Sequence, residues 1–140
     1  MPRSALLERL RRCDLFLFPS LRDGGGAVVL EAMAAGKSVV CLDLSGPGVH
    51  VTEACGIKVE ACTPAQVVAD LAAALRRLHD DAALRETMGR AARARAVTDY
   101  RWDRLGERLS DLYQRTVGGA SSLLAQDPLL APYEVLHAES

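Results

Sequence analysis

Two carboxylates flank a run of glycines near the start of the sequence. Asp23 and Glu31 lie eight positions apart. The three residues that follow Asp23 are Gly24, Gly25 and Gly26. The apolar segment 15–18 precedes them and an apolar helical segment follows from Ala27, so the glycines stand at a strand-to-helix turn. Such a turn lets backbone N–H groups approach phosphate, and neighbouring carboxylates can bind hydroxyls. The pattern predicts a site for a phosphorylated, hydroxyl-rich molecule such as a nucleotide-sugar.

Each of these residues also has a simpler explanation. Glu31 could be a solvated helix residue, which is the usual state of a charge on a helix. Asp23 could cap the helix or shape the turn. The glycines could form only a flexible loop. We favour the functional interpretation because the residues occur together in one motif.

Length and composition exclude several classes of protein. A chain of 140 residues fits one domain and can bury roughly two-thirds of its unfolded surface. The formal net charge of −1 gives no reason to expect a nucleic-acid binder or a polybasic membrane partner. No apolar run approaches the roughly 20 residues that span a bilayer. The N-terminus lacks the apolar region of a signal peptide.

The cysteines indicate a reducing compartment. They are Cys13, Cys41, Cys55 and Cys62, and they form no C-x-x-C pair. We interpret them as reduced thiols of a cytoplasmic protein rather than a disulfide or zinc set. No cluster of His, Cys and acidic residues has metal-ligand spacing, so no metal site is expected.

Short apolar segments alternate with helical patterns along the first half of the chain. The predicted strands are residues 15–18, 38–42 and 56–59. Helices are expected at 4–12 and from about 27 to 35, with Gly36 ending the second. Residues 43–52, which contain a Gly-Pro-Gly sequence, are expected to form a loop in which these three residues make a turn.

Strands that alternate with helices favour an α/β domain with a parallel sheet. About three strands is fewer than the five or six of a complete doubly wound sheet. We therefore predict a partial Rossmann-like doubly wound parallel sheet that is flanked by helices and followed by C-terminal helices.

The second half of the chain is mostly helical. Thr63 and Gln66 are placed to form a capping box, and Asp81 can cap the next helix. The arginine-rich run 85–95 is expected to be a solvated helix face, because acidic residues elsewhere balance it.

A last helix carries apolar residues at helical spacing. They are Trp102, Leu105, Leu109, Leu112 and Tyr113. We expect Trp102 and Tyr113 to lie in the core. Residues 118–122 are predicted to be a linker, and residues 119–140 a linker and flexible tail.

Taken as a connected series, these motifs resemble the retaining GT-B glycosyltransferases of the glycogen-synthase-like, group 1 type (family 4). The matching segments are residues 16–22, the acid pair at 23 and 31, and residues 31–36, 39–40, 46–48, 56–59 and 100–102. The likeness covers roughly residues 5–115, within a domain expected at 1–118. It corresponds to only the latter part of the family's C-terminal, donor-binding domain.

The resemblance implies an activity and a role for each site residue. The activity is transfer of a hexose from a nucleoside-diphosphate sugar to an acceptor with retention of configuration, with no cofactor besides the donor. Glu31 would bind the ribose hydroxyls, and Asp23, the catalytic position, would contact the transferred sugar. The backbone amides that approach the sugar and diphosphate would be those of Gly24, Gly25, Gly26 and Ala27.

The implied partners are the donor and an acceptor, which could be a glycan, a lipid or a small molecule. No nucleic acid is implied. An N-terminal acceptor domain could be supplied by another chain, and a membrane surface could be reached through that domain.

The sequence departs from the family pattern at several positions. Most members have glutamate where Asp23 stands, and many have glutamate where Val49 or His50 stands. We interpret His50 as a loop histidine rather than a catalytic base. The family's diphosphate-binding Arg and Lys lie upstream of this segment, and Arg22 and Lys37 do not occupy matching positions.

The absence of the family's diphosphate-binding Arg and Lys from this segment leads to two main hypotheses. Ligands of open α/β sheets bind where strand order reverses, and in the order 3-2-1-4-5-6 the predicted strands would be 4, 5 and 6. The chain would then supply one wall of the crevice and be inactive by itself. The alternative is a non-catalytic truncated or split chain that binds nucleotide-sugar weakly or needs a partner chain. An unrelated α/β interaction domain is a third hypothesis.

Overall fold

The computed structural model of the protein describes residues 2–117. The linker predicted at 118–122 and the tail predicted at 119–140 lie outside the described residues. The chain divides into two units, Met1–Tyr100 and Arg101–Ser140. The first unit contains the sheet and the candidate site.

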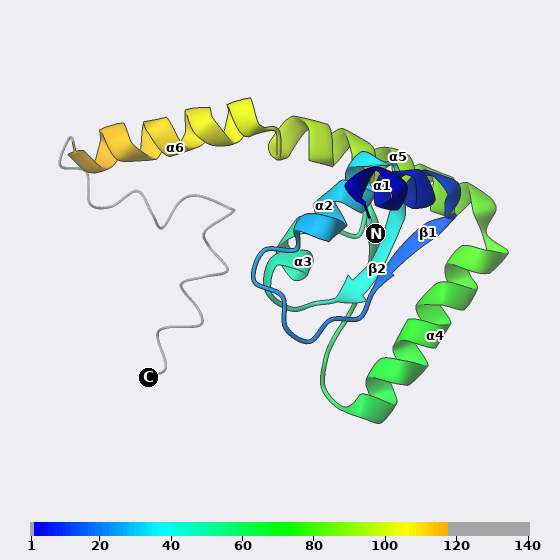
Figure 1. Ribbon diagram of the computed structural model, residues 1–140. Coiled ribbons are helices and arrows are strands. Elements are labelled where there is room, and N and C mark those ends of the chain that lie inside the picture. Colours follow the sequence, from blue (N-terminus) through cyan, green and yellow to red (C-terminus); the bar gives the residue numbers. More distant parts are fainter. Residues whose placement is uncertain (1, 118–140) are drawn as a thin grey trace. The chain divides into compact units, whose positions relative to one another are not determined.

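A three-stranded parallel sheet forms the centre of the first unit. Its strands are β1 (Leu15–Phe18), β2 (Ser38–Leu42) and β3 (Gly56–Val59), and they lie in the order β1-β2-β3. Figure 1 shows β1 and β2 side by side. Leu15 pairs with Ser38, and Val39 pairs with Gly56. The predicted α/β class, the strand positions and the parallel sheet are confirmed.

Helices connect the strands and follow them. The helices of the first unit are α1 (Arg3–Arg12), α2 (Ala27–Ala34), α3 (Ser45–His50), α4 (Pro64–Asp80) and α5 (Ala82–Asp99). The second unit contains α6 (Trp102–Val117). Because each crossover between parallel strands contains a helix, the carboxyl ends of all three strands meet at one edge of the sheet.

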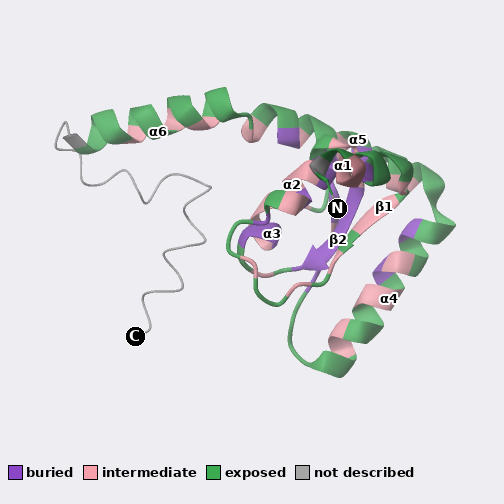
Figure 2. Cartoon of the chain, viewed as in Figure 1, coloured by how far each residue is buried: buried purple, intermediate pink, exposed green. Residues whose placement is uncertain are grey.

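The sheet is covered on both faces, as a parallel sheet requires. All residues of β2 are buried (Figure 2). On one face Val39 and Cys41 pack with Val29 and Met33 of α2, and on the other Val40 packs with Leu78 of α4. Helix α5 contributes to both apolar clusters, through Ala92 and Ala96 on one and through Met88 on the other.

The predicted helix boundaries follow from local hydrogen bonds. Gly36 has a positive φ of 74°, and the amides of Gly36 and Lys37 donate to the last turn of α2, which is the glycine-ended stop expected from the sequence. Thr63 and Gln66 form the capping box of α4. The Asp81 carboxylate accepts a hydrogen bond from the Leu84 amide at the start of α5.

The arginine-rich run of α5 is not simply a solvated face, and that prediction is wrong in part. Arg85 donates to the carbonyl of Leu78 at the end of α4, at 2.6 Å. Arg93 donates to the carbonyl of Ala34 at the end of α2, at 3.1 Å. Guanidinium groups satisfy helix C-terminal carbonyls and complement the helix dipole. A third arginine of α5 acts in the same way on α3, as described below.

The expected burial of Trp102 and Tyr113 is also wrong. The helix forms as predicted, but Trp102 is 89% exposed and Tyr113 is 65% exposed. Spacing shows which side chains share a helix face, but it does not show whether anything packs on that face. None of the helices in the described part of the chain has the length and apolar character needed to cross a bilayer.

A close backbone approach between α5 and the end of α2 yields a first prediction. A Cβ atom at Gly89 would lie 2.3 Å from the Gly36 carbonyl oxygen. We expect Gly89→Ala to lower the free energy of unfolding by about 1–3 kcal/mol, because the two backbones must move apart. Urea denaturation followed by circular dichroism measures the change. The control is Gly106→Ala in α6, where a Cβ meets nothing within 4 Å, so no loss is expected.

The buried thiol of Cys41 yields a second prediction. Burial, with a smaller effect of Asp43, raises the pKa of Cys41 from 9.0 to about 12. The unfolded thiol therefore loses its proton at lower pH than the folded one, and stability falls as pH rises from about 9 towards 12. Unfolding titrations across this pH range should show that the free energy of unfolding falls less steeply with pH in Cys41→Ala than in the unaltered protein. The exposed Cys62 provides the control, and Cys62→Ala should leave the slope unchanged.

Candidate functional site

The glycine turn lies between β1 and α2, at the carboxyl edge of the sheet. Oδ1 of Asp23 accepts hydrogen bonds from the amides of Gly25, at 3.1 Å, and Gly26. The structure therefore shows Asp23 shaping the turn, which is the simpler of its two explanations. Its predicted contact with a transferred sugar stays a prediction.

The three glycines of the turn differ in backbone conformation and in the space that a Cβ atom would have. Gly26 is the N-cap of α2 with a φ of 59°, and a Cβ there would lie 3.0–3.1 Å from His50 and Pro47. Backbone conformation and packing therefore explain Gly26. At Gly24 and Gly25 a Cβ would meet nothing within 4 Å, and neither has a positive φ. Contacts within the described chain do not explain why these two residues lack side chains.

The turn rests on residues that the sequence predicted to be a loop. Residues 45–50 instead form the short helix α3, so the loop prediction is wrong there. A Cβ at Gly46 would lie 2.8 Å from the Gly25 carbonyl carbon. The glycine turn and α3 therefore touch backbone to backbone, and the Gly-Pro-Gly sequence makes a contact as well as a bend.

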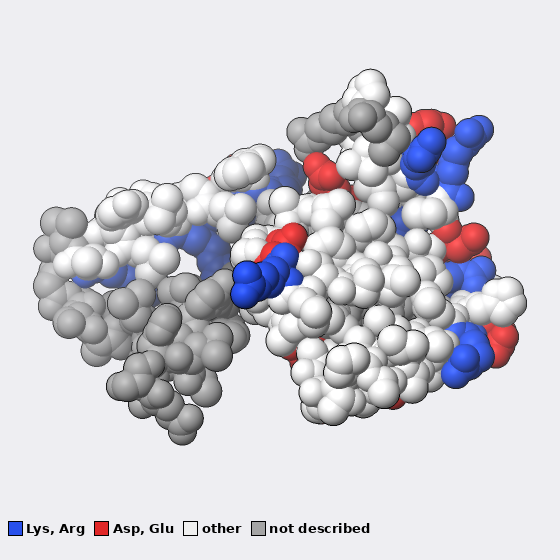
Figure 3. All heavy atoms as spheres, turned by 60° about the horizontal axis from the view of Figure 1, so that its bottom comes forward, with Lys and Arg blue, Asp and Glu red and all other residues white. Residues whose placement is uncertain are grey.

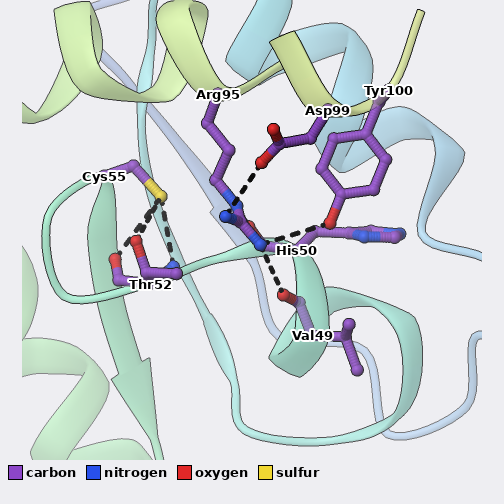
Figure 4. A network of polar contacts seen from close by, with 7 residues as sticks. All are labelled: Val49, His50, Thr52, Cys55, Arg95, Asp99 and Tyr100. Carbon is purple, nitrogen blue, oxygen red and sulfur yellow. Dashed lines mark hydrogen bonds and ion pairs between the residues drawn. The ribbon is translucent and has the colours of Figure 1, made fainter. Parts of the chain in front are cut away.

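Side chains from distant elements hold α3 in place (Figure 4). Arg95 of α5 donates through Nε to the His50 carbonyl, at 2.9 Å, and also reaches the Val49 carbonyl. Lys58 of β3 donates to the Gly48 carbonyl, at 3.2 Å. A helix of six residues that contains two glycines and a proline has little stability of its own. These donors satisfy its terminal carbonyls.

Further contacts orient the Arg95 side chain itself. Its guanidinium pairs with Asp99 at 3.1 Å and contacts the Tyr100 hydroxyl at 3.4 Å. Burial raises the pKa of Tyr100, and the nearby Arg95 opposes that rise. The guanidinium carbon also lies 5.7 Å from the centre of the Tyr100 ring. Arg95 is thus held from several sides where it meets α3.

His50 connects α3 directly to the glycine turn. Its Nε2 atom lies 2.8 Å from the Gly25 carbonyl oxygen, and its ring packs edge-on to Tyr100 with 4.9 Å between ring centres. Its Nδ1 atom is buried without a hydrogen-bond partner among the described residues. His50 is expected from the sequence to lie in a loop, whereas it ends α3 and contacts the turn. No local pattern could have shown it, because the partners lie 25 positions apart.

The start of α2 is the second part of the site. By the geometry of any helix start, the amides of Ala27 and Val28 have no acceptor within the helix. Glu31 follows Ala27 by four positions, which places the two on the same face of the helix. Glu31 is partly exposed and Ala27 is exposed. Ala27 and Glu31 therefore lie on one side of α2.

The cationic residues near the turn do not form an evident phosphate site. Lys37 donates to the Arg11 carbonyl at the end of α1, at 2.9 Å. Figure 3 shows a broad surface with few charged side chains on the side turned forward from the bottom of Figure 1. Among residues 2–117, no group of three or more His, Cys, Asp or Glu is placed to hold a metal ion. Arg22, which directly precedes Asp23, is exposed. The amides of Gly25 and Gly26 donate to the Asp23 carboxylate.

An apolar hollow of about 280 Å³ lies at the same edge of the sheet. Residues after each strand contribute to its wall: Pro19 and Leu21 follow β1, Leu42 ends β2, and Cys62 follows β3. Leu21 is 69% exposed. The carboxyl edge therefore offers an apolar wall as well as polar backbone groups.

Comparison with known proteins shows the family. The sequence profile of the family described as "Glycosyl transferases group 1" matches residues 1–95. The chain belongs to this glycosyltransferase family. The matched segment includes β1, the glycine turn, α2 and α3, which are the elements that build the candidate site.

Curated members of the family are similar over most of this chain. Glycogen synthase from Mycobacterium tuberculosis H37Rv is 35% identical over 113 residues, which is 81% of this chain and 27% of that protein. A GDP-mannose-dependent monoacylated alpha-(1-6)-phosphatidylinositol monomannoside mannosyltransferase from Corynebacterium glutamicum is 34% identical, covering 78% of this chain and 29% of that protein. The chain therefore spans less than a third of the length of these relatives.

A solved structure supports the fold. Sucrose-phosphate synthase from Thermosynechococcus elongatus superimposes with a TM-score of 0.68 at 24% sequence identity. The match covers 84% of this chain and 29% of that one. The three-stranded sheet and its helices thus correspond to part of a GT-B fold, as the resemblance implied.

The hydrogen bonds of Asp23 yield a third prediction. Asp23→Ala removes the acceptor for the Gly25 and Gly26 amides, so these amides should exchange with solvent faster. The free energy of unfolding should fall by about 0.5–2 kcal/mol, the usual effect of losing a helix-start acceptor. Hydrogen exchange by NMR and urea denaturation measure the two effects. Asp23→Asn keeps an oxygen acceptor, so exchange as fast as in Asp23→Ala would contradict the assignment.

Proposed function

We propose that the chain forms the donor side of a hexosyltransferase that uses a nucleoside-diphosphate sugar. The observation that carries this proposal is the open side of the glycine turn, where a Cβ at Gly24 or Gly25 would meet nothing within 4 Å. A ligand that approaches the backbone closely accounts for glycine at both positions. Membership of the glycosyltransferase family supports this class of ligand.

The proposed roles follow the chemistry of each group. Glu31 accepts hydrogen bonds from the ribose hydroxyls, because a carboxylate binds neutral hydroxyls well. The diphosphate lies against the backbone amides of the turn and of Ala27, at the positive end of the α2 dipole. Keeping Glu31 one turn along the helix separates its charge from the phosphates.

Asp23 has two tasks in this proposal. Without donor its carboxylate satisfies the Gly25 and Gly26 amides. When a donor binds, the phosphate or sugar oxygens compete for these amides, and the Asp23 carboxylate turns to accept hydrogen bonds from the sugar hydroxyls. The carboxylate thereby fills the amide site until an anionic ligand arrives.

The proposed reaction retains the configuration of the sugar. The bond from the anomeric carbon to the diphosphate breaks and a bond to the acceptor oxygen forms on the same face. The leaving phosphate takes the proton of the acceptor hydroxyl, so no resident cofactor or metal is needed. The acceptor is a glycan, a lipid or a small molecule, and the reaction takes place in the cytoplasm.

A second candidate function is binding without catalysis by this chain alone. The strand β1 lies at an edge of the described sheet, and Leu17 of this strand is 37% exposed. Apolar edge strands favour association with another strand-bearing partner. The chain would then bind nucleotide-sugar weakly, or would need a partner chain that carries an acceptor domain.

Substitutions on the open side of the turn test the proposed donor site. Gly24→Val adds a side chain into open space, so the fold should keep its stability while donor affinity falls at least tenfold. Glu31→Gln should also weaken binding, because the amide is a poorer acceptor for paired hydroxyls. Titrations of the full chain with UDP-glucose, ADP-glucose and GDP-mannose, followed by calorimetry and amide NMR shifts, measure both effects.

The matched control for Glu31→Gln is Glu8→Gln on the exposed face of α1, which should bind as the unaltered chain does. Affinity unchanged by both Gly24→Val and Glu31→Gln would exclude the turn as the donor site. A glycosyl-transfer assay of the chain alone, with labelled donors, should show no turnover. Repeated turnover by the isolated chain would overturn the half-site proposal.

A further inference from the structure

We propose that His50 is a positioning residue of the donor turn: it holds the Gly25 carbonyl and thereby fixes the direction of the Gly26 amide. The inference rests on the proposed function, because it names the residue that shapes the donor site. His50 touches the turn from α3 and acts on a ligand only through the backbone.

His50 and Asp23 contact the two ends of the peptide bond between Gly25 and Gly26. In a trans peptide the carbonyl oxygen and the following N–H point in opposite directions within one plane. Nε2 of His50 lies 2.8 Å from the Gly25 oxygen, and Asp23 accepts from the Gly26 N–H on the other side. The two side chains therefore fix both ends of one peptide plane.

The protonation of the ring follows from its partner. A carbonyl oxygen can only accept a hydrogen bond, so Nε2 of His50 must carry the hydrogen. The Nδ1 atom is buried and has no hydrogen-bond partner among the described residues. The ring therefore makes its polar contact with the turn through Nε2, which bonds the Gly25 oxygen. The edge-on packing against Tyr100 sets the plane of the ring.

Arg95 supports this arrangement of His50. It donates to the backbone carbonyl of His50, at 2.9 Å, so the main chain of His50 is fixed as well as its ring. Arg95 therefore holds the backbone of His50 from α5, Tyr100 packs against the His50 ring, and the ring contacts the turn before α2. Glycines have the largest backbone freedom, so a turn with three of them needs such an external anchor.

The inference predicts a loss of donor affinity without a loss of fold. Without the Nε2 donor, the Gly25–Gly26 peptide can rotate once a ligand displaces Asp23, and ordering it again weakens binding. We expect His50→Leu to raise the dissociation constant at least fivefold for whichever of UDP-glucose, ADP-glucose and GDP-mannose binds the full chain. The NMR shifts of the Gly25 and Gly26 amides should also change in the absence of donor.

Two conservative variants separate positioning from a general role in stability. The amide nitrogen of His50→Gln reaches about as far as Nε2 and should restore both the affinity and the amide shifts. The amide nitrogen of His50→Asn corresponds to Nδ1 and is too short, so it should behave as His50→Leu does. His79→Leu, at an exposed position on α4, is the control for a change from histidine to leucine and should change neither measurement.

The outcomes separate this inference from the proposed function. Amide shifts and affinity that are unchanged in His50→Leu and His50→Asn would overturn the inference, as would a failure of His50→Gln to restore them. If no donor binds the unaltered chain, the donor-site proposal fails. The donor-free amide shifts then decide alone whether His50 holds the turn. If His50→Leu does not fold, the comparison of His50→Asn with His50→Gln decides.

Discussion

The backbone contact between the glycine turn and α3 is the constraint on which the site depends. A side chain at Gly46 would collide with the backbone of Gly25, so α3 must contain a glycine where it meets the turn. A second glycine in α3, Gly48, leaves room for Asp43, since a Cβ there would lie 2.7 Å from its carboxylate oxygen. These requirements make α3 a poor helix by itself. Its stability must come from Arg95 and Lys58, which reach it from α5 and β3.

The proposed donor site uses backbone amides rather than a cluster of basic side chains. Three cations in this part of the fold are engaged in structural contacts: Arg95 with α3, Lys58 with Asp43 and α3, and Lys37 with α1. In the proposed site, carboxylates and helix-start amides contact the ligand. Such a surface suits a ligand whose charge is spread over phosphates and whose remaining groups are hydroxyls. The chain covers less than a third of the length of these relatives, which agrees with the proposal that it forms one side of a donor site.

The sequence predicted the features that arise from neighbouring residues and missed those that join distant ones. The three strands, the glycine stop at Gly36 and the caps at Thr63 and Asp81 follow from periodicity and local hydrogen bonds, and the structure confirms them. The helix at residues 45–50 was missed because its composition disfavours it and tertiary donors stabilise it. The burial of Trp102 was wrong because an apolar stripe does not reveal what covers it. For the site, the residues of the turn were found from the motif, whereas the roles of His50 and Arg95 depend on contacts across 25 and 45 positions.

The arginines of α5 have a consequence for how this fold opens. One helix supplies a C-terminal hydrogen-bond partner to each of α2, α3 and α4. Each of those helices therefore loses one of its end contacts when α5 detaches. The three helices and α5 should belong to a single cooperative unit of unfolding, so partial opening would expose the donor turn and the core together. In the described part of the fold, the glycine turn should therefore not persist once its support from α5 is lost.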